Sequence, residues 1–246
     1  MKSACIFSIA DQRNMEYFSK FRQSLRHWHK EEEVDLLLIT EKEIAQFKDP
    51  RFFYRAKPII ASQLIGQYET IIGMDCDQIV CGDISELWNN KDKVDVMCVL
   101  NSNPKEAKTY PVQVWDIGVS EYLNAGLVVM KSEQFIRNWL GVCMGPKFEH
   151  YQFGEQDTLN ILVNYGPYTT KILDRGDSFW GLSSKQYWNK IELRGSELVL
   201  PKGEEWPTQD KKIKVLHTGG GNIPNKLNFG PYMKGEVLEW LENLMK

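Results

Sequence analysis

The chain has 246 residues, of which 42% are hydrophobic and 26% are charged. These values are typical of globular proteins and argue against long disordered stretches. The net charge of −3 argues against a general nucleic-acid-binding protein, so we expect no nucleic-acid partner. The aromatic content is high, with eight Trp, ten Tyr and eleven Phe. It indicates either a well-filled core or platforms for flat ligands.

The cysteines and the apolar segments bear on the compartment of the protein. The five cysteines are odd in number and include no C-x-x-C pair. A zinc site or a disulfide framework is therefore not favoured, and we expect a cytoplasmic protein. The apolar run at residues 4–10 ends at Asp11, and we interpret it as a buried first strand rather than a signal peptide. No run approaches the roughly 20 apolar residues of a membrane span, so no span is predicted.

Strands and helices alternate over the first 165 residues. The predicted elements are strand 5–10, helix 14–28, strand 34–40, helix 58–67, strands 70–74, 94–100 and 125–130, helices 132–143 and 156–163, strand 214–217 and helix 236–246. Such alternation predicts an α/β fold with a mostly parallel central sheet and helices on both faces. No internal repeat or linker stands out, so a single domain over residues 1–246 is favoured.

A pair of carboxylates and one histidine stand where predicted strands end. Asp75 and Asp77 follow the strand at residues 70–74, and ligands of open α/β sheets bind outside the carboxyl ends of the strands. Two carboxylates at that place suit a hard divalent cation, whose remaining ligands are water and phosphate oxygens. His217 ends the strand at 214–217 and precedes three glycines, a backbone that can approach phosphate closely. A D-x-D pair is also common by chance, and lone histidines are more often structural.

Short motifs follow one another in a fixed order along the chain. They are Tyr54-Arg-Ala-Lys57, Asp75-Cys-Asp77 with Asp83-Ile-Ser-Glu-Leu-Trp88, Tyr122-Leu-Asn124-Ala-Gly126-Leu-Val-Val-Met130, Phe153-Gly-Glu155-Gln156-Asp157-Thr-Leu-Asn160 and His217-Thr-Gly-Gly220. In this order they resemble the motifs of glycosyltransferase family 8, which includes glycogenin and bacterial lipopolysaccharide galactosyl- and glucosyltransferases. The resemblance extends over nearly the whole chain.

The resemblance implies a GT-A fold with a Rossmann-like nucleotide-binding half at about residues 1–100. A donor-sugar and acceptor half would cover about 101–230, and a C-terminal helix 231–246. The implied reaction is transfer of a hexose from a nucleotide-sugar, with a UDP-sugar favoured, to a hydroxyl of a glycan or glycoprotein acceptor. Anomeric configuration would be retained, and the implied cofactor is Mn²⁺, with Mg²⁺ as the alternative.

The resemblance also implies roles for single residues. The metal ligands would be Asp75, Asp77 and His217. The residues implied to bind the nucleotide-sugar with its metal are Asp75, Asp77, Lys57, Ala10, Gly220 and Lys226, and the implied catalytic residues are Asn124, Glu155, Gln156 and Asp157. Because a glutamine is a poor nucleophile, we expect the acceptor to attack from the face of the leaving phosphate.

Three departures from the family pattern leave other functions open. Glu155 and Asn101 stand where the family has aspartates, and no K-P-W triplet follows His217, the nearest lysine being Lys226. An inactive nucleotide-sugar-binding protein of the same fold is therefore an alternative. A nucleotidyltransferase is less favoured, because the segment after Ile9 lacks the Gly-rich loop usual in those enzymes.

The segment at residues 174–210 has no clear periodicity and contains Trp180, Trp188 and Trp206. Long aperiodic segments in compact domains are usually functional or mobile. Two interpretations are equally favoured: aromatic packing beneath a long loop, or a platform on the acceptor side of the site.

Overall fold

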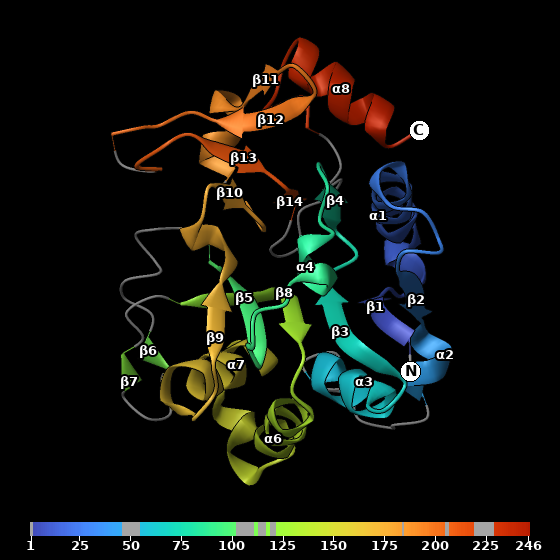
Figure 1. Ribbon diagram of the computed structural model, residues 1–246, viewed down its shortest axis with the longest axis vertical. Coiled ribbons are helices and arrows are strands. Elements are labelled where there is room, and N and C mark those ends of the chain that lie inside the picture. Colours follow the sequence, from blue (N-terminus) through green and yellow to red (C-terminus); the bar gives the residue numbers. More distant parts are fainter. Residues whose placement is uncertain are drawn as a thin grey trace.

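A six-stranded sheet forms the centre of the protein (Figure 1). The computed structural model describes residues 2–45, 55–101, 111–112, 117–118, 122–183, 185–204, 207–218 and 229–246. The strand order is β2-β1-β3-β8-β5-β9. The strands are β1 (Lys2–Ile9), β2 (Asp35–Ile39), β3 (Tyr68–Met74), β5 (Val96–Leu100), β8 (Leu123–Met130) and β9 (Thr170–Ile172).

The sheet is mixed but mostly parallel, which confirms the predicted α/β class. Strands β2 and β3 run parallel to β1, and β9 runs parallel to β5. Strand β8 departs from the fully parallel pattern, because it runs antiparallel to both β3 and β5. The start of β8 therefore lies beside the end of β3, and this reversal brings two sequence motifs together.

Helices cover both faces of the sheet, as predicted. The longer helices are α1 (Met15–Trp28), α3 (Ala56–Leu64), α6 (Glu133–Cys143) and α7 (Glu155–Tyr165), and the others are α2 (Glu41–Ala45), α4 (Glu86–Asn89) and α8 (Glu236–Leu244). Short 3-10 turns lie at η1 (Gln12–Asn14), η3 (Pro146–His150), η4 (Leu173–Arg175) and η5 (Lys185–Lys190).

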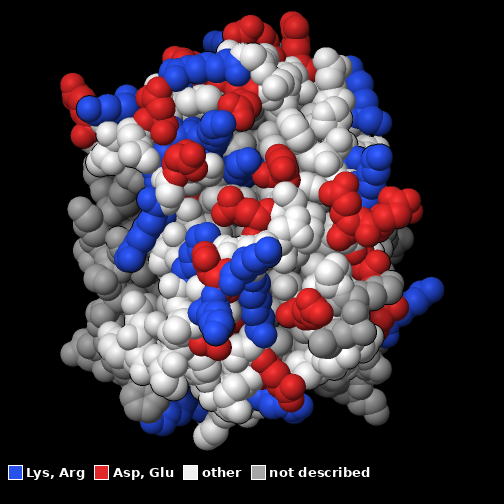
Figure 2. Space-filling view, viewed as in Figure 1, with Lys and Arg blue, Asp and Glu red and all other residues white. Residues whose placement is uncertain are grey.

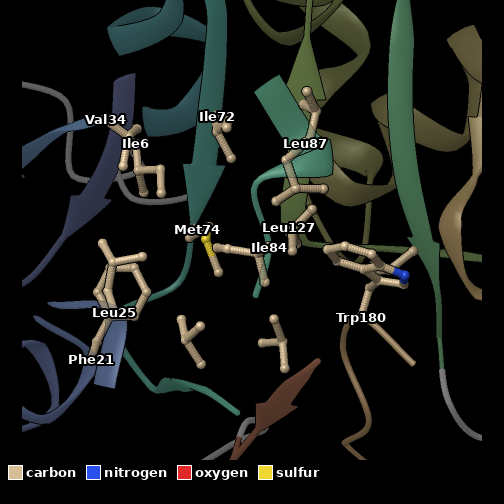
Figure 3. Packing of buried hydrophobic residues seen from close by; sticks show 14 of the residues in the cluster. Ile6, Phe21, Leu25, Val34, Ile72, Met74, Ile84, Leu87, Leu127 and Trp180 are labelled. Carbon is tan, nitrogen blue, oxygen red and sulfur yellow. The ribbon is translucent and has the colours of Figure 1, made fainter. Parts of the chain in front are cut away.

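Alternate residues of β1 enter two different cores. Phe7 packs with residues of α3 and α6, including Trp139, in one cluster. Ile6 packs with Phe21 and Leu25 of α1 in the other, which also contains Trp180 (Figure 3). This alternation follows from the two-residue period of a strand and explains why β1 reads as a continuous apolar run.

The segment at residues 174–210 is more regular than predicted. It contains β10 (Ser178–Phe179), β11 (Glu192–Arg194) and β12 (Glu197–Leu200), which join β13 (Lys211–Ile213) in a second sheet of order β10-β13-β12-β11. Trp180 and Trp188 are 2% and 1% exposed, so packing explains them and the platform interpretation is wrong for both. Trp206 lies outside the described residues.

Two further strand pairs complete the described structure. Strand β4 (Gln78–Val80) pairs antiparallel with β14 (Val215–His217), and β6 (Pro111–Val112) pairs with β7 (Ile117–Gly118). None of the helices in the described ranges has the length and apolar character needed to cross a bilayer. Acidic and basic side chains are interspersed on the face seen in Figure 2. The division into a nucleotide-binding half and an acceptor half stays a prediction.

Candidate functional site

Backbone pairing brings the two predicted metal-ligand segments together. Asp75 directly follows β3, and its backbone N–H donates to the Gly126 carbonyl of β8 at 2.8 Å. On the other side, His217 lies opposite Gln78 in the β4–β14 pair, and the Thr218 backbone N–H donates to the Asp77 carbonyl at 2.9 Å. A turn between β3 and β4 thus carries both aspartates to the end of β14.

The three predicted metal ligands converge. One ligand atom each of Asp75, Asp77 and His217 lies within 4.8 Å of the other two. His217 Nε2 is 3.4 Å from Asp75 Oδ2 and 3.3 Å from Asp77 Oδ1. Asp77 and His217 are buried, whereas Asp75 is half-buried and open to the cavity.

Gly126 makes this arrangement possible, because the His217 ring occupies the space above its Cα. A Cβ atom at this position would lie 2.5 Å from His217 Cε1 and 2.6 Å from Asn124 Oδ1. Distances below 3.0 Å require a side chain or the backbone to move. The glycine of the Asn124-Ala-Gly126 motif therefore has a steric role that its sequence context did not reveal.

Gly126→Ala is expected to lower the affinity for Mn²⁺ by about tenfold or more while the fold is retained, because it displaces His217. Isothermal titration with Mn²⁺ and circular dichroism would measure the two effects. Gly141→Ala is the matched control, since a Cβ there meets nothing within 4 Å and replaces a glycine in helix α6. The control should keep its metal affinity and gain about 0.5–1 kcal/mol of stability. Equal metal affinity in both variants would contradict the steric role of Gly126.

Lys57 compensates the negative charge beside the candidate metal site. Its Nζ is 2.7 Å from Asp75 Oδ1 and 2.9 Å from Glu155 Oε1, and its backbone N–H donates to Glu155 Oε2 at 3.2 Å. Burial alone would lower the pKa of Lys57, but Asp75 and Glu155 raise it above its ordinary value. Lys57 therefore stays protonated, and both carboxylate oxygens of Glu155 are engaged by it.

Burial and charge partners shift the pKa values of the carboxylates and the histidine. Burial raises the pKa of Asp75, but Lys57 and His217 outweigh it and hold this pKa well below its usual range. Burial dominates for Glu155, whose pKa is raised despite Lys57. Burial also lowers the pKa of His217, but Asp77 and Asp75 more than reverse this and raise it to about 10. The histidine thus carries a proton between two carboxylates at neutral pH.

The chemistry of these side chains fits a divalent cation. Two carboxylates and an imidazole nitrogen converge. The proton on His217 and the ammonium group of Lys57 balance the charge of these carboxylates. Carboxylate oxygens and imidazole suit Mn²⁺, and carboxylates with phosphate oxygens suit Mg²⁺. Asp75, Asp77 and His217 would hold the ion.

We expect the affinity for Mn²⁺ to rise by about tenfold per pH unit between pH 6.5 and 8, because the cation must displace a proton from His217 Nε2. The affinity rises rather than falls with pH because the pKa of His217 is raised, so the histidine is protonated below about pH 10 in the absence of metal. Titrations in two buffers of different ionisation enthalpy should show the release of about one proton per ion. His217→Gln should bind weakly and release none, and a pH-independent affinity would rule out the exchange.

Helix α7 fixes the start of β8 through side chains of one motif. Gln156 Oε1 accepts from the Ala125 N–H at 3.0 Å, and Asn160 Oδ1 accepts from the Leu123 N–H at 2.7 Å. Asn160 also donates to the Leu123 carbonyl at 2.9 Å. The Asp157 carboxylate accepts hydrogen bonds from the Tyr122 hydroxyl at 2.5 Å and from the Phe153 backbone N–H at 2.9 Å. The helix therefore orients the strand that carries Asn124.

A cavity of about 620 Å³ contains most of the predicted site residues. Among the described residues, its lining includes the predicted residues Lys57, Asp75, Asp77, Asn124, Glu155, Gln156 and His217. Ala10 is buried and is not part of the lining, and Asp157 is buried against Tyr122. Gly220 and Lys226 lie outside the described residues. The roles predicted for all these residues stay predictions.

Several lining residues were not predicted from the sequence. Asn14 ends turn η1 and directly precedes helix α1. Gln152 precedes the Phe153–Asn160 motif, and Phe153 begins it but had no predicted role of its own. Cys76 lies between the two aspartates. Asn14 could have been found, because a polar residue after the first strand lies at the same sheet edge as Asp75. Gln152 stands in a loop with no periodic signal.

A comparison with family models gives one match, to glycosyl transferase family 8, over residues 2–189. The chain belongs to glycosyltransferase family 8. No curated protein matches the chain. The predicted family is thus confirmed.

Solved structures share the fold at low sequence identity. The galactosyltransferase LgtC, in complex with donor and acceptor sugar analogs, is 13% identical and has a TM-score of 0.64, with 98% of this chain and 95% of that chain covered. GlyE, a glycosyltransferase of Streptococcus pneumoniae, is 15% identical with a TM-score of 0.58, and WbbM, a bifunctional glycosyltransferase, is 15% identical with a TM-score of 0.62. This chain aligns over its nearly full length with only 61% of GlyE and 50% of WbbM. These likenesses confirm the GT-A-like fold.

Proposed function

We propose that this protein transfers a hexose from a nucleotide-sugar, with a UDP-sugar favoured, to a hydroxyl of a glycan or glycoprotein acceptor. The proposed transfer retains anomeric configuration and depends on Mn²⁺. The observation that carries the proposal is the convergence of Asp75, Asp77 and His217 at a cavity that also contains Lys57 and Gln156. A membership of family 8 supports the same reaction class.

The charges of the site suit a diphosphate leaving group. When bound, the cation would neutralise the negative charge that grows on the leaving nucleotide. Lys57 adds a fixed ammonium beside Asp75, and it is held in place by Glu155 on its other side. A charge that is fixed before the reaction stabilises the transition state without a cost of reorganisation.

Two amide side chains offer hydrogen-bond donors to a sugar. Gln156 Oε1 is occupied by the Ala125 N–H, and Asn124 Oδ1 accepts from the Gly126 N–H at 2.7 Å. Both oxygens thus face backbone donors, so each side chain has its NH₂ group to offer to hydroxyl or phosphate oxygens. Gln156 is then a donor that orients the substrate rather than a nucleophile.

The carboxylates of the cavity favour attack on the face of the leaving group. Within the described part of the chain, those that line the cavity are Asp75, Asp77 and Glu155, and each is paired with Lys57 or His217. We infer that the acceptor oxygen bonds to the anomeric carbon as the bond to phosphate breaks. The acceptor proton passes to the leaving phosphate oxygen, which balances the charge. A trapped glycosyl-enzyme adduct at Glu155 or Asp157 would contradict this mechanism.

A panel of UDP- and GDP-sugars tests the proposed function. The protein should hydrolyse or transfer from at least one donor with Mn²⁺, and EDTA should abolish this activity. Chromatography of the released nucleotide measures turnover, and NMR of the product gives the anomeric configuration. Tight nucleotide-sugar binding without turnover on any donor and acceptor would identify an inactive binding protein instead.

A further inference from the structure

A second cavity lies at the end of the molecule that carries β11 and α8 (Figure 1). Its volume is about 330 Å³, and it lies between turn η5 and residues 231–237. Its polar and aromatic lining comes from Trp188, Asn189, Tyr232 and Lys234, with apolar residues making up the remainder. The proposed sugar transfer does not use this cavity.

The charged group in the lining of the cavity is a lysine, in a chain whose net charge is −3. Lys234 is in its lining, whereas no acidic side chain among the described residues is. The Lys185 Nζ lies 5.3 Å from the centre of the Tyr232 ring and 5.7 Å from that of Trp188. Of the carboxylates that the structure describes, none lies within 4.0 Å of the Lys185 amine. Lys234 in the lining and Lys185 over two rings of the lining thus bring two positive charges to this part of the surface.

Aromatic residues in the lining offer a ligand an apolar surface in addition to the positive charge. Tyr232 is half-buried and lines the cavity, and it packs edge-on against Trp188 with ring centres 5.7 Å apart. The Trp188 indole N–H is buried and has no hydrogen-bond partner among the described residues. Ring surface beside lysines and the Asn189 amide suits a ligand with one apolar face, several hydroxyls and a negative group. An acidic sugar has this combination.

The turn that carries Lys185 follows a residue that pairs with the candidate metal site. The Leu182 carbonyl accepts from the His217 backbone N–H at 3.1 Å. Lys185 is three residues further on, so its Cα lies at most about 11 Å from that of Leu182. An acceptor of a few sugar units is long enough to cover this distance.

We propose that this cavity binds an acidic sugar of the acceptor glycan, with its ring against Tyr232 and its carboxylate or phosphate between Lys185 and Lys234. The proposal rests on the proposed function, because it names the class of acceptor. It makes Lys185 a specificity-determining residue that acts away from the reacting atoms.

The binding can be measured on the intact protein without metal or donor. Protein labelled with 5-fluorotryptophan would be titrated by ¹⁹F NMR, with Trp188→Phe used to assign the Trp188 signal. The probes are methyl β-glucuronide, glucose 6-phosphate, methyl β-glucoside and inorganic phosphate. Acidic sugars should move the Trp188 signal and bind about tenfold more tightly than the neutral glucoside. The stronger of the two acidic probes identifies carboxylate or phosphate as the negative group.

Lysine variants test the assignment. Lys185→Gln and Lys234→Gln should each weaken binding of the acidic probes by about tenfold. Lys190→Gln is the matched control, because this lysine lies on the same turn but over Tyr187, which is not in the lining, whereas Lys185 lies over the lining residues Trp188 and Tyr232. Three results would overturn the proposal: no response to any acidic sugar, equal binding of acidic and neutral sugars, or equal binding of inorganic phosphate and glucose 6-phosphate.

The test separates this proposal from the proposed function. Binding to the second cavity should persist in Asp75→Asn, whose metal site is disrupted, because the cavity contains none of the metal ligands. Loss of the acidic-sugar response with donor turnover intact would refute the second cavity alone. A preserved response without turnover on any donor would refute the transferase instead.

Discussion

Asp75→Asn and Asp77→Asn should each lower the affinity for Mn²⁺ by at least about 100-fold, because each removes a charged ligand and not merely a supporting partner. Donor turnover should fall with metal occupancy. Isothermal titration with Mn²⁺ and turnover of the best nucleotide-sugar measure the two effects. Circular dichroism should show a retained fold, since both substitutions keep the shape of the side chain.

Asp83→Asn is the matched control for these two variants. Asp83 stands in the same motif region, but its side chain is 64% exposed and accepts from the Ser85 backbone N–H. This control should bind Mn²⁺ like the unchanged protein. Unchanged metal affinity in Asp75→Asn or Asp77→Asn would refute the metal site, and equal losses in all three variants would indicate a general electrostatic effect.

Lys57→Ala should reduce the free energy of unfolding by about 3–5 kcal/mol, because it leaves the Glu155 carboxylate buried without its partner. The side chains of Lys57 and Glu155 are only 10% and 9% exposed. Urea denaturation at pH 7 would measure the loss. Arg137→Ala is the control, since Arg137 and Glu133 form an ion pair on helix α6 with exposures of 60% and 57%. That exposed pair should contribute at most about 0.5 kcal/mol, and similar losses in both variants would contradict the distinction.

A reciprocal change of length tests whether Glu155 acts by positioning Lys57. Lys57→Arg lengthens the cation and Glu155→Asp shortens the acid, so each alone should disturb the contact at 2.9 Å. The double variant should recover metal affinity and stability, with a coupling of about 1–3 kcal/mol. Simple addition of the two single losses would mean that Glu155 does not act through Lys57.

The main features of the site could be predicted because they lie at the ends of strands. Asp75 and His217 follow short apolar runs. Such a run predicts a strand, and the polar residue after it predicts where the strand ends. The partners of each strand could not be predicted in the same way. The antiparallel course of β8 and the pairing of β4 with β14 join distant segments, and periodicity within one segment carries no information about its neighbour.

The burial of the tryptophans at residues 174–210 also could not be predicted from the sequence. The strands β10 to β13 have two to four residues each, which is too short for an alternating pattern to be recognised. The segment therefore looked irregular, and the burial of Trp180 and Trp188 could not be separated from exposure. Lys57 was predicted as a point charge near the diphosphate, but its fixed position between two carboxylates depends on helix α7, nearly a hundred residues later.

The β4–β14 pair has a consequence for how the protein loses its structure. Thr218 and Asp77 are 141 residues apart in sequence, and this two-stranded pair holds them together outside the six-stranded sheet. A cation between Asp75, Asp77 and His217 would act as a clasp across that long loop and would stabilise the folded protein in proportion to its occupancy. Depletion of the metal would then open the molecule first at this pair, so faster hydrogen exchange at the backbone amides of β4 and β14 would report an empty site before any loss of the central sheet.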